Sequence, residues 1–412
     1  FKKGDCLSPS NYRAISLLSI PGKVFSQILL DRMKKQTEIC ISESQFGFRP
    51  ERGTVDAIFI TRQVLEKANE HNINVHMNFI DFKSAFDTIW RKALWKMMIS
   101  LGVDQKNACI IEGLYNNTEW AIVIDGSLTK WFSVNVGVRQ GCLLSPTLFN
   151  IFLDFVMKEL KSVQTNLALT EHLSCDIRYA DDTTLISVIF EQLQLSTQEL
   201  EQACKKWGMK INTSKTKIIS SNNDAISIDG VQIENVDSFV YLGSTIPNTT
   251  NDIIRRTALA AQAFGRLQNV VWRNRDISFK LKVRLYNALI LPIAIYAAET
   301  WTLTERDKRI ITTFEMRCLR CILGVTLFDR LRNDAIREKF GIQKNIVDMI
   351  RSRQLKWFGH VVRRHQNGYV NTVFREDFIK KRLPGLPKKR WSDQIHDHLK
   401  LVLQTLRRVA HD

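Results

Sequence analysis

The chain has 412 residues, 44% hydrophobic and 25% charged, and a formal net charge of +17. That length exceeds one compact core and predicts two or three structural units of ordinary globular composition. The longest apolar run, residues 288–298, is too short for a membrane span and contains Pro292. Nothing at the N-terminus resembles a signal peptide, and the lack of an initiator Met suggests the edge of a fragment.

The positive charge is concentrated in the second part of the chain. Residues 1–246 contain 26 of the 59 Lys and Arg residues and 27 of the 42 Asp and Glu residues. Residues 247–412 contain the other 33 basic and 15 acidic residues. The first part is therefore close to neutral, and the second carries the whole excess. An asymmetry of this kind indicates a polyanionic partner, with nucleic acid as the first candidate.

The first part predicts strands mixed with helices. Apolar periodicity predicts helices over residues 23–35, 54–70, 90–101, 145–163 and 191–207. Strands are expected over residues 75–82, 120–124, 131–136, 175–180 and 183–190. Ser145 is expected to cap a helix that starts with Pro146, and Gly208 to end another.

The second part predicts helices alone from about residue 247, where the charge also changes. They are expected over residues 252–272, 278–296, 305–323 and 347–361. An α+β unit is therefore expected first, and an all-α unit after it. Cys318 and Cys321 form the one Cys-x-x-Cys pair, with His360 and His365 downstream. Packing of both cysteines on a helix is favoured over a zinc site, and the scattered cysteines indicate reduced thiols.

Three aspartates are candidate metal ligands. Asp81 ends a predicted strand, and Asp181 and Asp182 lie at the tip of a predicted hairpin. Acidic groups beside apolar strands are costly unless a cation binds them. Mg²⁺ prefers carboxylate oxygens, and two such ions serve phosphoryl transfer. An Asp-Asp pair taken alone is better explained as a turn former.

The residues around these aspartates resemble the reverse transcriptases of LINE-type (non-LTR) retrotransposons. Tyr179-Ala180-Asp181-Asp182 matches the catalytic tetrapeptide of that family, and residues 78–87 match its first palm motif. The other matches, in the family's order, are two finger motifs, the Gln-Gly palm motif, the fourth palm motif and the primer-grip region, at residues 11–18, 45–50, 137–151, 208–217 and 239–243. A lone Tyr-x-Asp-Asp would be weak, but the ordered set is specific.

The resemblance implies a right-hand polymerase fold. Fingers and palm, an antiparallel sheet with helices, would occupy residues 1–246, a helical thumb 247–340 and a basic region 341–412. The resemblance further implies that three aspartates and the carbonyl of one phenylalanine bind two Mg²⁺ ions, for which Mn²⁺ can substitute: Asp81, Asp181, Asp182 and Phe82.

Further roles are implied around the substrates. Phe86 occupies the position of the steric gate that selects deoxynucleotides, although packing in the core would also explain an aromatic there. Nucleotide contacts are implied for Arg13, Lys23, Gln140 and Gly141. A thumb holds template–primer duplex by its phosphates. The basic residues suited to that task are Arg255, Arg256, Arg266, Arg273, Arg275, Lys280, Lys282 and Arg284.

The C-terminal basic region supports several interpretations. Residues 380–391 combine two basic runs with prolines and Trp391 and are expected to be extended. A grip on target DNA or element RNA, a nuclear-localisation signal and a solvated tail all remain open. The chain also departs from the family at Ala14 and Leu144, where Pro is common, and at Ser84, where Lys is frequent. None of these departures removes a metal ligand or the gate.

The implied function is RNA-directed DNA polymerisation. Its partners would be an RNA template, a DNA primer or target and dNTPs, inside the cell in the nucleus or cytoplasm, without a membrane or an evident protein partner. The alternative is a degenerate or domesticated retroelement protein that only binds nucleic acid. A viral RNA polymerase or an intron maturase fits less well. Whether an upstream endonuclease was truncated is not decided by the sequence.

Overall fold

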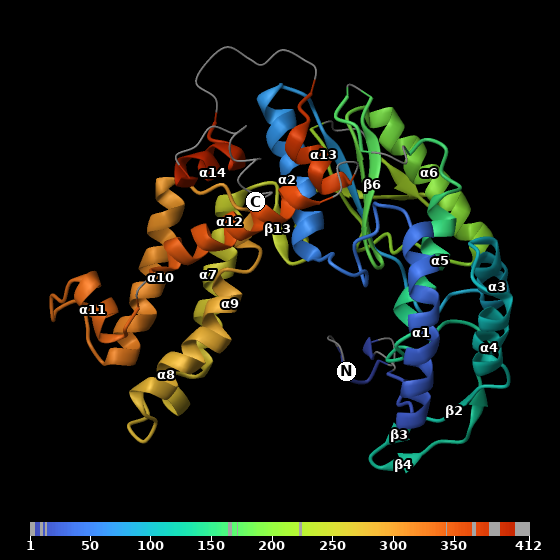
Figure 1. Cartoon of the computed structure of the whole chain (residues 1–412), viewed down its shortest axis with the longest axis horizontal. Helices are drawn as coiled ribbons and strands as arrows, with labels where there is room; N and C mark the ends of the chain where they lie inside the picture. Colours follow the sequence, from blue (N-terminus) through green and yellow to red (C-terminus); the bar gives the residue numbers. More distant parts are fainter. Residues whose placement is uncertain are drawn as a thin grey trace. The chain divides into compact units, whose positions relative to one another are not determined.

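The computed structural model describes residues 5–8, 11–12, 15–163, 167–170, 172–221, 225–342, 344–364, 368–378 and 388–399 (Figure 1). Backbone contacts divide the chain into two compact units. The first unit combines Phe1–Gly53 with Asn74–Val236, and the second combines Thr54–Ile73 with Asp237–Asp412. Each unit therefore draws on two separate stretches of sequence.

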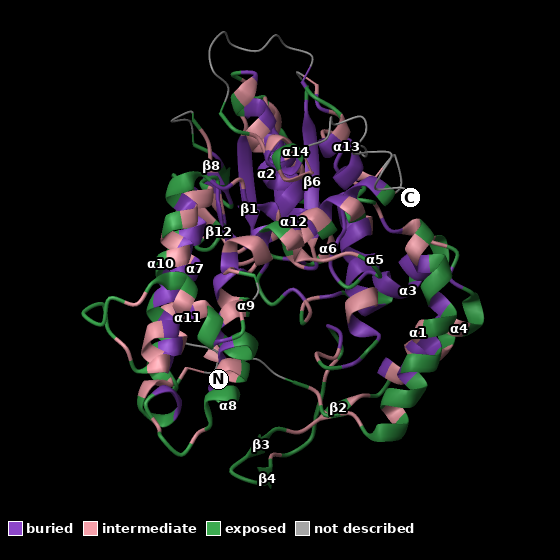
Figure 2. Ribbon diagram, turned by 60° about the vertical axis from the view of Figure 1, so that its left-hand side comes forward, coloured by how far each residue is buried: buried purple, intermediate pink, exposed green. Residues whose placement is uncertain are grey.

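The first unit is built on a five-stranded sheet with the strand order β11-β8-β1-β7-β6. β1 (His76–Ile80) lies in the middle and pairs antiparallel with β7 (Asp182–Ser187) and β8 (Lys217–Ile219). β6 (Ser174–Tyr179) pairs antiparallel with β7 at one edge, and β11 (Glu234–Asn235) runs parallel to β8 at the other. Every residue of β1 is buried, as the purple strands of Figure 2 show.

Helices bury the sheet of the first unit. α6 (Phe190–Trp207) packs against β1 and β7, and α5 (Ser145–Met157) packs against α6. α5 is apolar on nearly all sides, as expected of a helix enclosed by other elements. The remaining elements of this unit are α1 (Ile20–Cys40), α3 (Arg91–Ser100), α4 (Gln105–Tyr115), β2 (Glu119–Trp120), β3 (Val123–Ile124), β4 (Ser127–Leu128), β5 (Phe132–Ser133), β9 (Ser227–Ile228) and β10 (Val231–Gln232).

The second unit is mainly helical and includes α2 (Thr54–Glu70), which precedes the sheet in sequence. Arg62 of α2 forms a buried 3.0 Å ion pair with Asp252, and the Phe59 ring lies 4.9 Å from that of Trp391. The other elements are β12 (Phe239–Tyr241), β13 (Ser244–Ile246), α7 (Thr249–Arg266), the π-helix η2 (Gln268–Trp272), α8 (Phe279–Leu285), the π-helix η3 (Tyr286–Ile290), α9 (Leu291–Ala294), η4 (Ala298–Thr300), α10 (Glu305–Leu323), α11 (Asn333–Lys339), α12 (Ile346–Arg363), α13 (Tyr369–Arg375) and α14 (Trp391–Leu399).

Several expected boundaries differ in the structure. Leu144, not Ser145, is the N-cap of α5, and the helix ends at Met157 instead of continuing to residue 163. The two long helices expected over 252–272 and 278–296 are divided by the π-helical segments η2 and η3. The backbone contacts also change near residue 237 instead of 247, because the β12–β13 hairpin packs against α7.

The C-terminal basic run is not wholly extended. Trp391 begins α14, is fully buried and donates through Nε1 to the carbonyl of Glu299 at 2.8 Å. Its indole is therefore a packing residue and does not stack on a ligand. Residues 380–382 lie outside the described residues. Among the helices that the structure describes, none is long and apolar enough to cross a membrane.

Candidate active site

The turn between β6 and β7 presents the Asp-Asp pair. Tyr179 pairs with Asp182, so Ala180 and Asp181 are the two turn residues. Ala180 has a φ of 56°, in the left-handed region that residues other than glycine seldom adopt. Asp182 is then the first residue of β7. The predicted hairpin is confirmed, with one aspartate in its turn and one at the start of its second strand.

The third aspartate comes from the neighbouring strand. The last paired residues of β1 and β7 are Ile80 and Thr183, so the next position along β1 is Asp81 and the preceding one on β7 is Asp182. Asn212 donates its side-chain amide to Asp81 Oδ2 at 2.9 Å, and the Lys215 ammonium lies 3.3 Å from the same oxygen. The sheet thereby brings together carboxylates about 100 positions apart in the sequence.

Burial and two neighbouring carboxylates perturb the carboxyl of Asp182. The protein around the carboxyl of Asp182, together with the charges of Asp181 and Asp81, raises its pKa to about 6, although the residue as a whole is exposed. A raised pKa means that the site disfavours a full set of negative charges without a cation. The Lys217 ammonium pairs with Glu234 at 2.5 Å.

Gln45 and Gly47 contact the turn between β6 and β7. The fully buried Gln45 accepts through Oε1 from the backbone N–H of Ala180 at 2.9 Å and of Gly47 at 2.8 Å. A Cβ on Gly47 would lie 2.3 Å from the nitrogen of Ala180, so no other residue fits there. The sequence matched this stretch as a finger motif but assigned neither residue a role.

A buried ionic network includes two residues of β6, Asp176 and Arg178. Arg178, 2% exposed, forms ion pairs with Asp176 at 2.6 Å and with Asp154 at 3.1 Å. The Ser44 hydroxyl accepts from the guanidinium at 2.6 Å and donates to Asp176 at 2.9 Å. Removing one partner of such a network leaves a buried charge uncompensated. Neither Asp154 nor Asp176 was singled out from the sequence.

The expected nucleotide-pocket residues also lie in the first unit. The half-buried Phe86 ring stacks on Phe149, with centroids 4.6 Å apart, so it packs as well as facing outward. Gln140 donates to Asp87 Oδ1 at 3.1 Å. A Cβ on Gly141, whose φ is 102°, would lie 2.9 Å from the carbonyl oxygen of Ser16. Glycine is therefore required at this contact.

The other residues expected to contact the nucleotide or the metal are Lys23, Phe82 and Arg13. Lys23 is exposed in the first turn of α1. Phe82 is buried and forms an isolated bridge with Ile211. Arg13 lies outside the described residues.

The basic residues expected in the thumb divide into two groups. Arg256 and Lys282 are each 9% exposed, and Arg255 is half-buried and donates to the carbonyl of Gly243 at 2.9 Å. Arg256 also donates to that carbonyl and lies over the Tyr296 ring at 4.1 Å. The contacts of Arg255 and Arg256 hold the Leu242-Gly243 turn between β12 and β13. Burial leaves Arg256 and Lys282 poorly placed to bind phosphate. The exposed members are Arg266, Arg273, Arg275, Lys280 and Arg284.

The described residues do not favour a zinc site at the Cys-x-x-Cys pair. Cys318 is buried, and its burial raises its thiol pKa to about 12, which disfavours the thiolate that binds metal. Within the described ranges, the group of three metal-capable side chains packed within 4.8 Å is Glu70, His71 and Asp377. Lys67 pairs with Asp377 there, and Arg390 with Glu70, so cationic side chains already neutralise its carboxylates.

A right-hand polymerase palm is the class of fold that this sheet and its aspartates define. The chain belongs to the reverse transcriptase (RNA-dependent DNA polymerase) family, whose model matches residues 1–246.

The relatives are proteins of mobile elements. The RNA-directed DNA polymerase from mobile element jockey of Drosophila funebris is 26% identical over 79% of this chain and 37% of its own length. The Pol polyprotein from the type-1 retrotransposable element R2 of Popillia japonica is 27% identical over 53% of this chain and 31% of its own length. The chain thus spans well under half of these proteins. Apo telomerase from Candida tropicalis gives a TM-score of 0.41 at 14% identity, over 82% of this chain and 54% of its own, too low to add to the assignment.

Proposed function

We propose that this chain is the polymerase part of a non-LTR retrotransposon protein, which extends a DNA 3′-hydroxyl on an RNA template. The observation that carries the proposal is the placement of Asp81 beside Asp182 at adjoining strand ends, with Asp181 in the turn. The matched family and the jockey relatives support the same reaction.

The residues present fit a pair of divalent cations. Carboxylate oxygens are the ligands that Mg²⁺ prefers, and the raised pKa of Asp182 reflects a negative charge density that a cation would relieve. Asp81, Asp181, Asp182 and the carbonyl of Phe82 would hold two Mg²⁺ ions, with Mn²⁺ as a substitute. Bound there, such ions lower the pKa of the attacking hydroxyl and stabilise the charge of the departing pyrophosphate.

The other residues of the site position the reactants. Gln45 and Gly47 fix the position of the catalytic turn through their contacts with the backbone of Ala180. The Phe86 ring, held by its stack on Phe149, is placed to crowd a 2′-hydroxyl and so to select deoxynucleotides. We assign triphosphate contacts to Lys23 and Arg13, and a place beside the nucleotide to Gln140 and Gly141. The exposed thumb arginines and lysines would bind the phosphates of the product duplex.

Primer extension on poly(rA)/oligo(dT) with dTTP and Mg²⁺ tests the proposal. Asp181→Asn should abolish extension, with a loss of about a thousandfold or more, because the change removes charge stabilisation of several kcal/mol. Asp125→Asn is the matched control, since Asp125 is exposed in the β3–β4 turn and its positive φ suits asparagine. Extension at the wild-type rate by folded Asp181→Asn protein would refute the proposal and favour a protein that only binds nucleic acid.

A further inference from the structure

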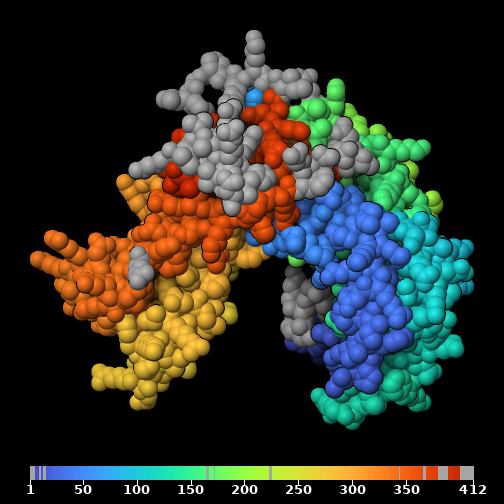
Figure 3. Space-filling model, in the orientation of Figure 1, coloured from blue at the N-terminus to red at the C-terminus, as the bar shows by residue number. Residues whose placement is uncertain are grey.

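A basic groove runs along α10 in the second unit, and none of the residues assigned to catalysis line it. Two adjoining hollows share Glu305, Arg309 and Thr313, and the larger continues past Arg320 to the loop before α11. From Glu305 to Arg320 the helix rises about 22 Å at 1.5 Å per residue. α10 and α11 contribute the orange surface of Figure 3.

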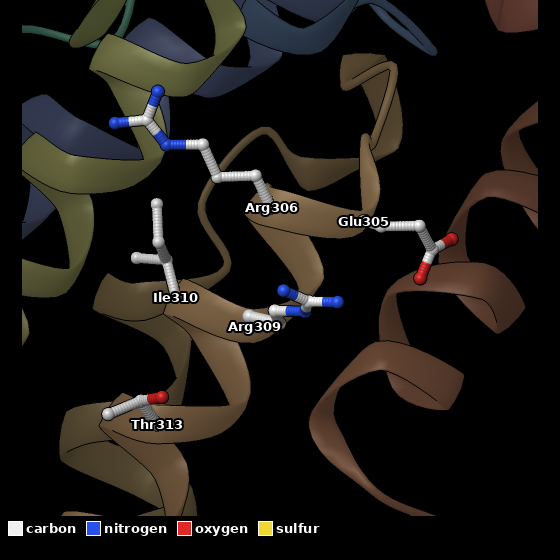
Figure 4. A pocket seen from close by; sticks show the side chains of 5 residues that line it. All are labelled: Glu305, Arg306, Arg309, Ile310 and Thr313. Carbon is white, nitrogen blue, oxygen red and sulfur yellow. The ribbon is translucent and has the colours of Figure 1, made fainter.

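Cations dominate the groove. Four cationic side chains and one carboxylate line the larger hollow: Lys308, Arg309, Arg317, Arg320 and Glu305. Glu305 is paired with Lys308 at 2.7 Å. Arg309 and Arg317 are exposed, and no ion pair joins either to a carboxylate in the described part of the chain. Figure 4 shows Arg309 and Arg306 leaving the helix in different directions. Of the two, Arg309 also lines the larger hollow.

The spacing of the groove residues suits a chain of phosphates. Arg309, Thr313 and Arg317 recur every four residues and therefore form one ridge on the helix surface. Arg320 is oriented by hydrogen bonds to the Asn333 side chain at 2.8 Å and the Leu331 carbonyl at 3.3 Å. Guanidinium groups and hydroxyls in line are donors that match phosphate oxygens.

An exposed aromatic residue stands beside the end of the groove. Leu327, which lines it, is 77% exposed, and its neighbour Phe328 is 95% exposed. The loop that carries them is held by Asp329, which accepts from the backbone and hydroxyl of Thr326 at 2.6 and 2.9 Å. The Phe328 ring is therefore accessible beside the cationic end of the groove, where it can stack against a flat ligand group.

We propose that this groove binds a single-stranded nucleic acid, with its phosphates on Arg309, Arg317 and Arg320 and an unpaired base stacked on Phe328. Cationic grooves with an aromatic platform are suited to single strands because every unpaired base offers a π-face, whereas the bases of a duplex are covered. The excess of cations favours a polyanion over a neutral protein partner. This binding needs no catalytic residue and so goes beyond the polymerase reaction.

Binding of fluorescent oligo(rU) and oligo(dT) to the full chain tests the inference, with excess unlabelled blunt RNA/DNA hybrid present to occupy the residues that bind duplex. The double variant Arg309→Glu/Arg317→Glu should weaken binding at least tenfold and flatten the slope of log K against log[salt] by about 1.4, at about 0.7 per phosphate. Phe328→Ala should weaken binding by about tenfold, within the range seen for loss of one stacked base, and Phe328→Tyr should retain it.

Matched variants separate the groove from general charge. Lys339→Glu/Lys356→Glu changes the charge equally at exposed positions outside the groove and should leave the affinity within about twofold of wild type. Asp181→Asn should bind oligo(rU) normally, so failure of catalysis and failure of the groove are distinguishable. Stronger binding of oligo(rU) than of oligo(dT) would identify the strand as RNA. Equal losses in groove and control variants, or Arg309-dependent capture of an oligoglutamate peptide in place of the oligonucleotides, would overturn the inference.

Discussion

In the first unit Arg178 is 2% exposed and bonded to two aspartates, whereas in the second unit Arg273, Arg275 and Arg284 are exposed. The first arrangement uses charge to fix the position of a strand, because a buried guanidinium tolerates only a complete set of partners. The second leaves charge in solvent, where it can meet a flexible polyanion. One region thus depends on exact geometry, the other on summed charge, and the two should respond differently to substitution.

Among substitutions that leave the three aspartates in place, the largest effect is expected at Gly47, which contacts the β6–β7 turn. Gly47→Ala places a methyl group 2.3 Å from the Ala180 nitrogen, which must displace the turn. Extension should fall by about a hundredfold or more, because misplacement by about 1 Å has that consequence. Gly113→Ala is the control, since a Cβ on Gly113 of α4 meets nothing within 4 Å. Full activity in Gly47→Ala would show that the site is not governed by this contact.

Charge reversal in the second unit should weaken duplex binding gradually, with each reversed residue adding to the loss. Arg273→Glu, Lys280→Glu and Arg284→Glu together should weaken binding of an RNA/DNA hybrid and reduce its salt slope by up to about 2.7, at about 0.9 per phosphate. The loss should be similar for unrelated duplex sequences, because phosphate contacts carry no sequence information. The same reversals at the exposed Lys92, Lys96 and Lys106 of the first unit provide the comparison. Equal slopes for both triple variants would show that Arg273, Lys280 and Arg284 do not bind the duplex.

A truncation at residue 246 would be a poor substitute for those reversals. It would retain α2 but remove its partners, including Asp252, which pairs with Arg62. Eleven residues of α2 are buried, so the shortened chain would expose apolar surface and an unpaired charge.

Phe86→Ala should relax sugar selection. Loss of the ring opens space for a 2′-hydroxyl, and the ratio of rNTP to dNTP incorporation should rise by about tenfold or more, equivalent to at least about 1.4 kcal/mol. Because Phe86 also stacks on Phe149, the melting temperature should fall as well. Phe86→Tyr should preserve both properties. An unchanged ratio with reduced stability would make Phe86 a packing residue only.

The smallest effect concerns pH. The pKa of Asp182 is raised from 3.8 to about 6 in the folded chain, so the folded state binds more protons than the unfolded state between these values. Without metal, this group should therefore lower stability as pH rises from about 4 to about 6. Urea unfolding at pH 4.5 and 7 should show a smaller decline in Asp182→Asn than in wild type. The same decline in both proteins would mean that Asp182 does not contribute to the pH dependence of stability.

Sequence predicted the fold class and the position of the three aspartates because these depend on ordered motifs and apolar alternation. It did not predict that α2 belongs with the helical unit, since the partners of Arg62 and Phe59 lie about 190 and 330 positions away. Nor did it distinguish Arg256 from Arg273: both are basic and close in sequence, but one lies on the buried face of α7 and the other follows the π-helix η2 in solvent. The number of basic residues in a segment does not show which of their side chains are buried and which are exposed.

The clearance beneath Ala180 has a consequence for telling intact genomic copies of such an element from inactive ones. A survey that checks only for three aspartates would count as intact a copy in which Gly47 has become serine. Because even a single methyl group would lie 2.3 Å from the Ala180 nitrogen, that copy would encode all three aspartates and still lose most of its activity. Genome surveys should therefore score residue 47 together with the aspartates, because a one-codon change there can silence a copy without touching its chemistry.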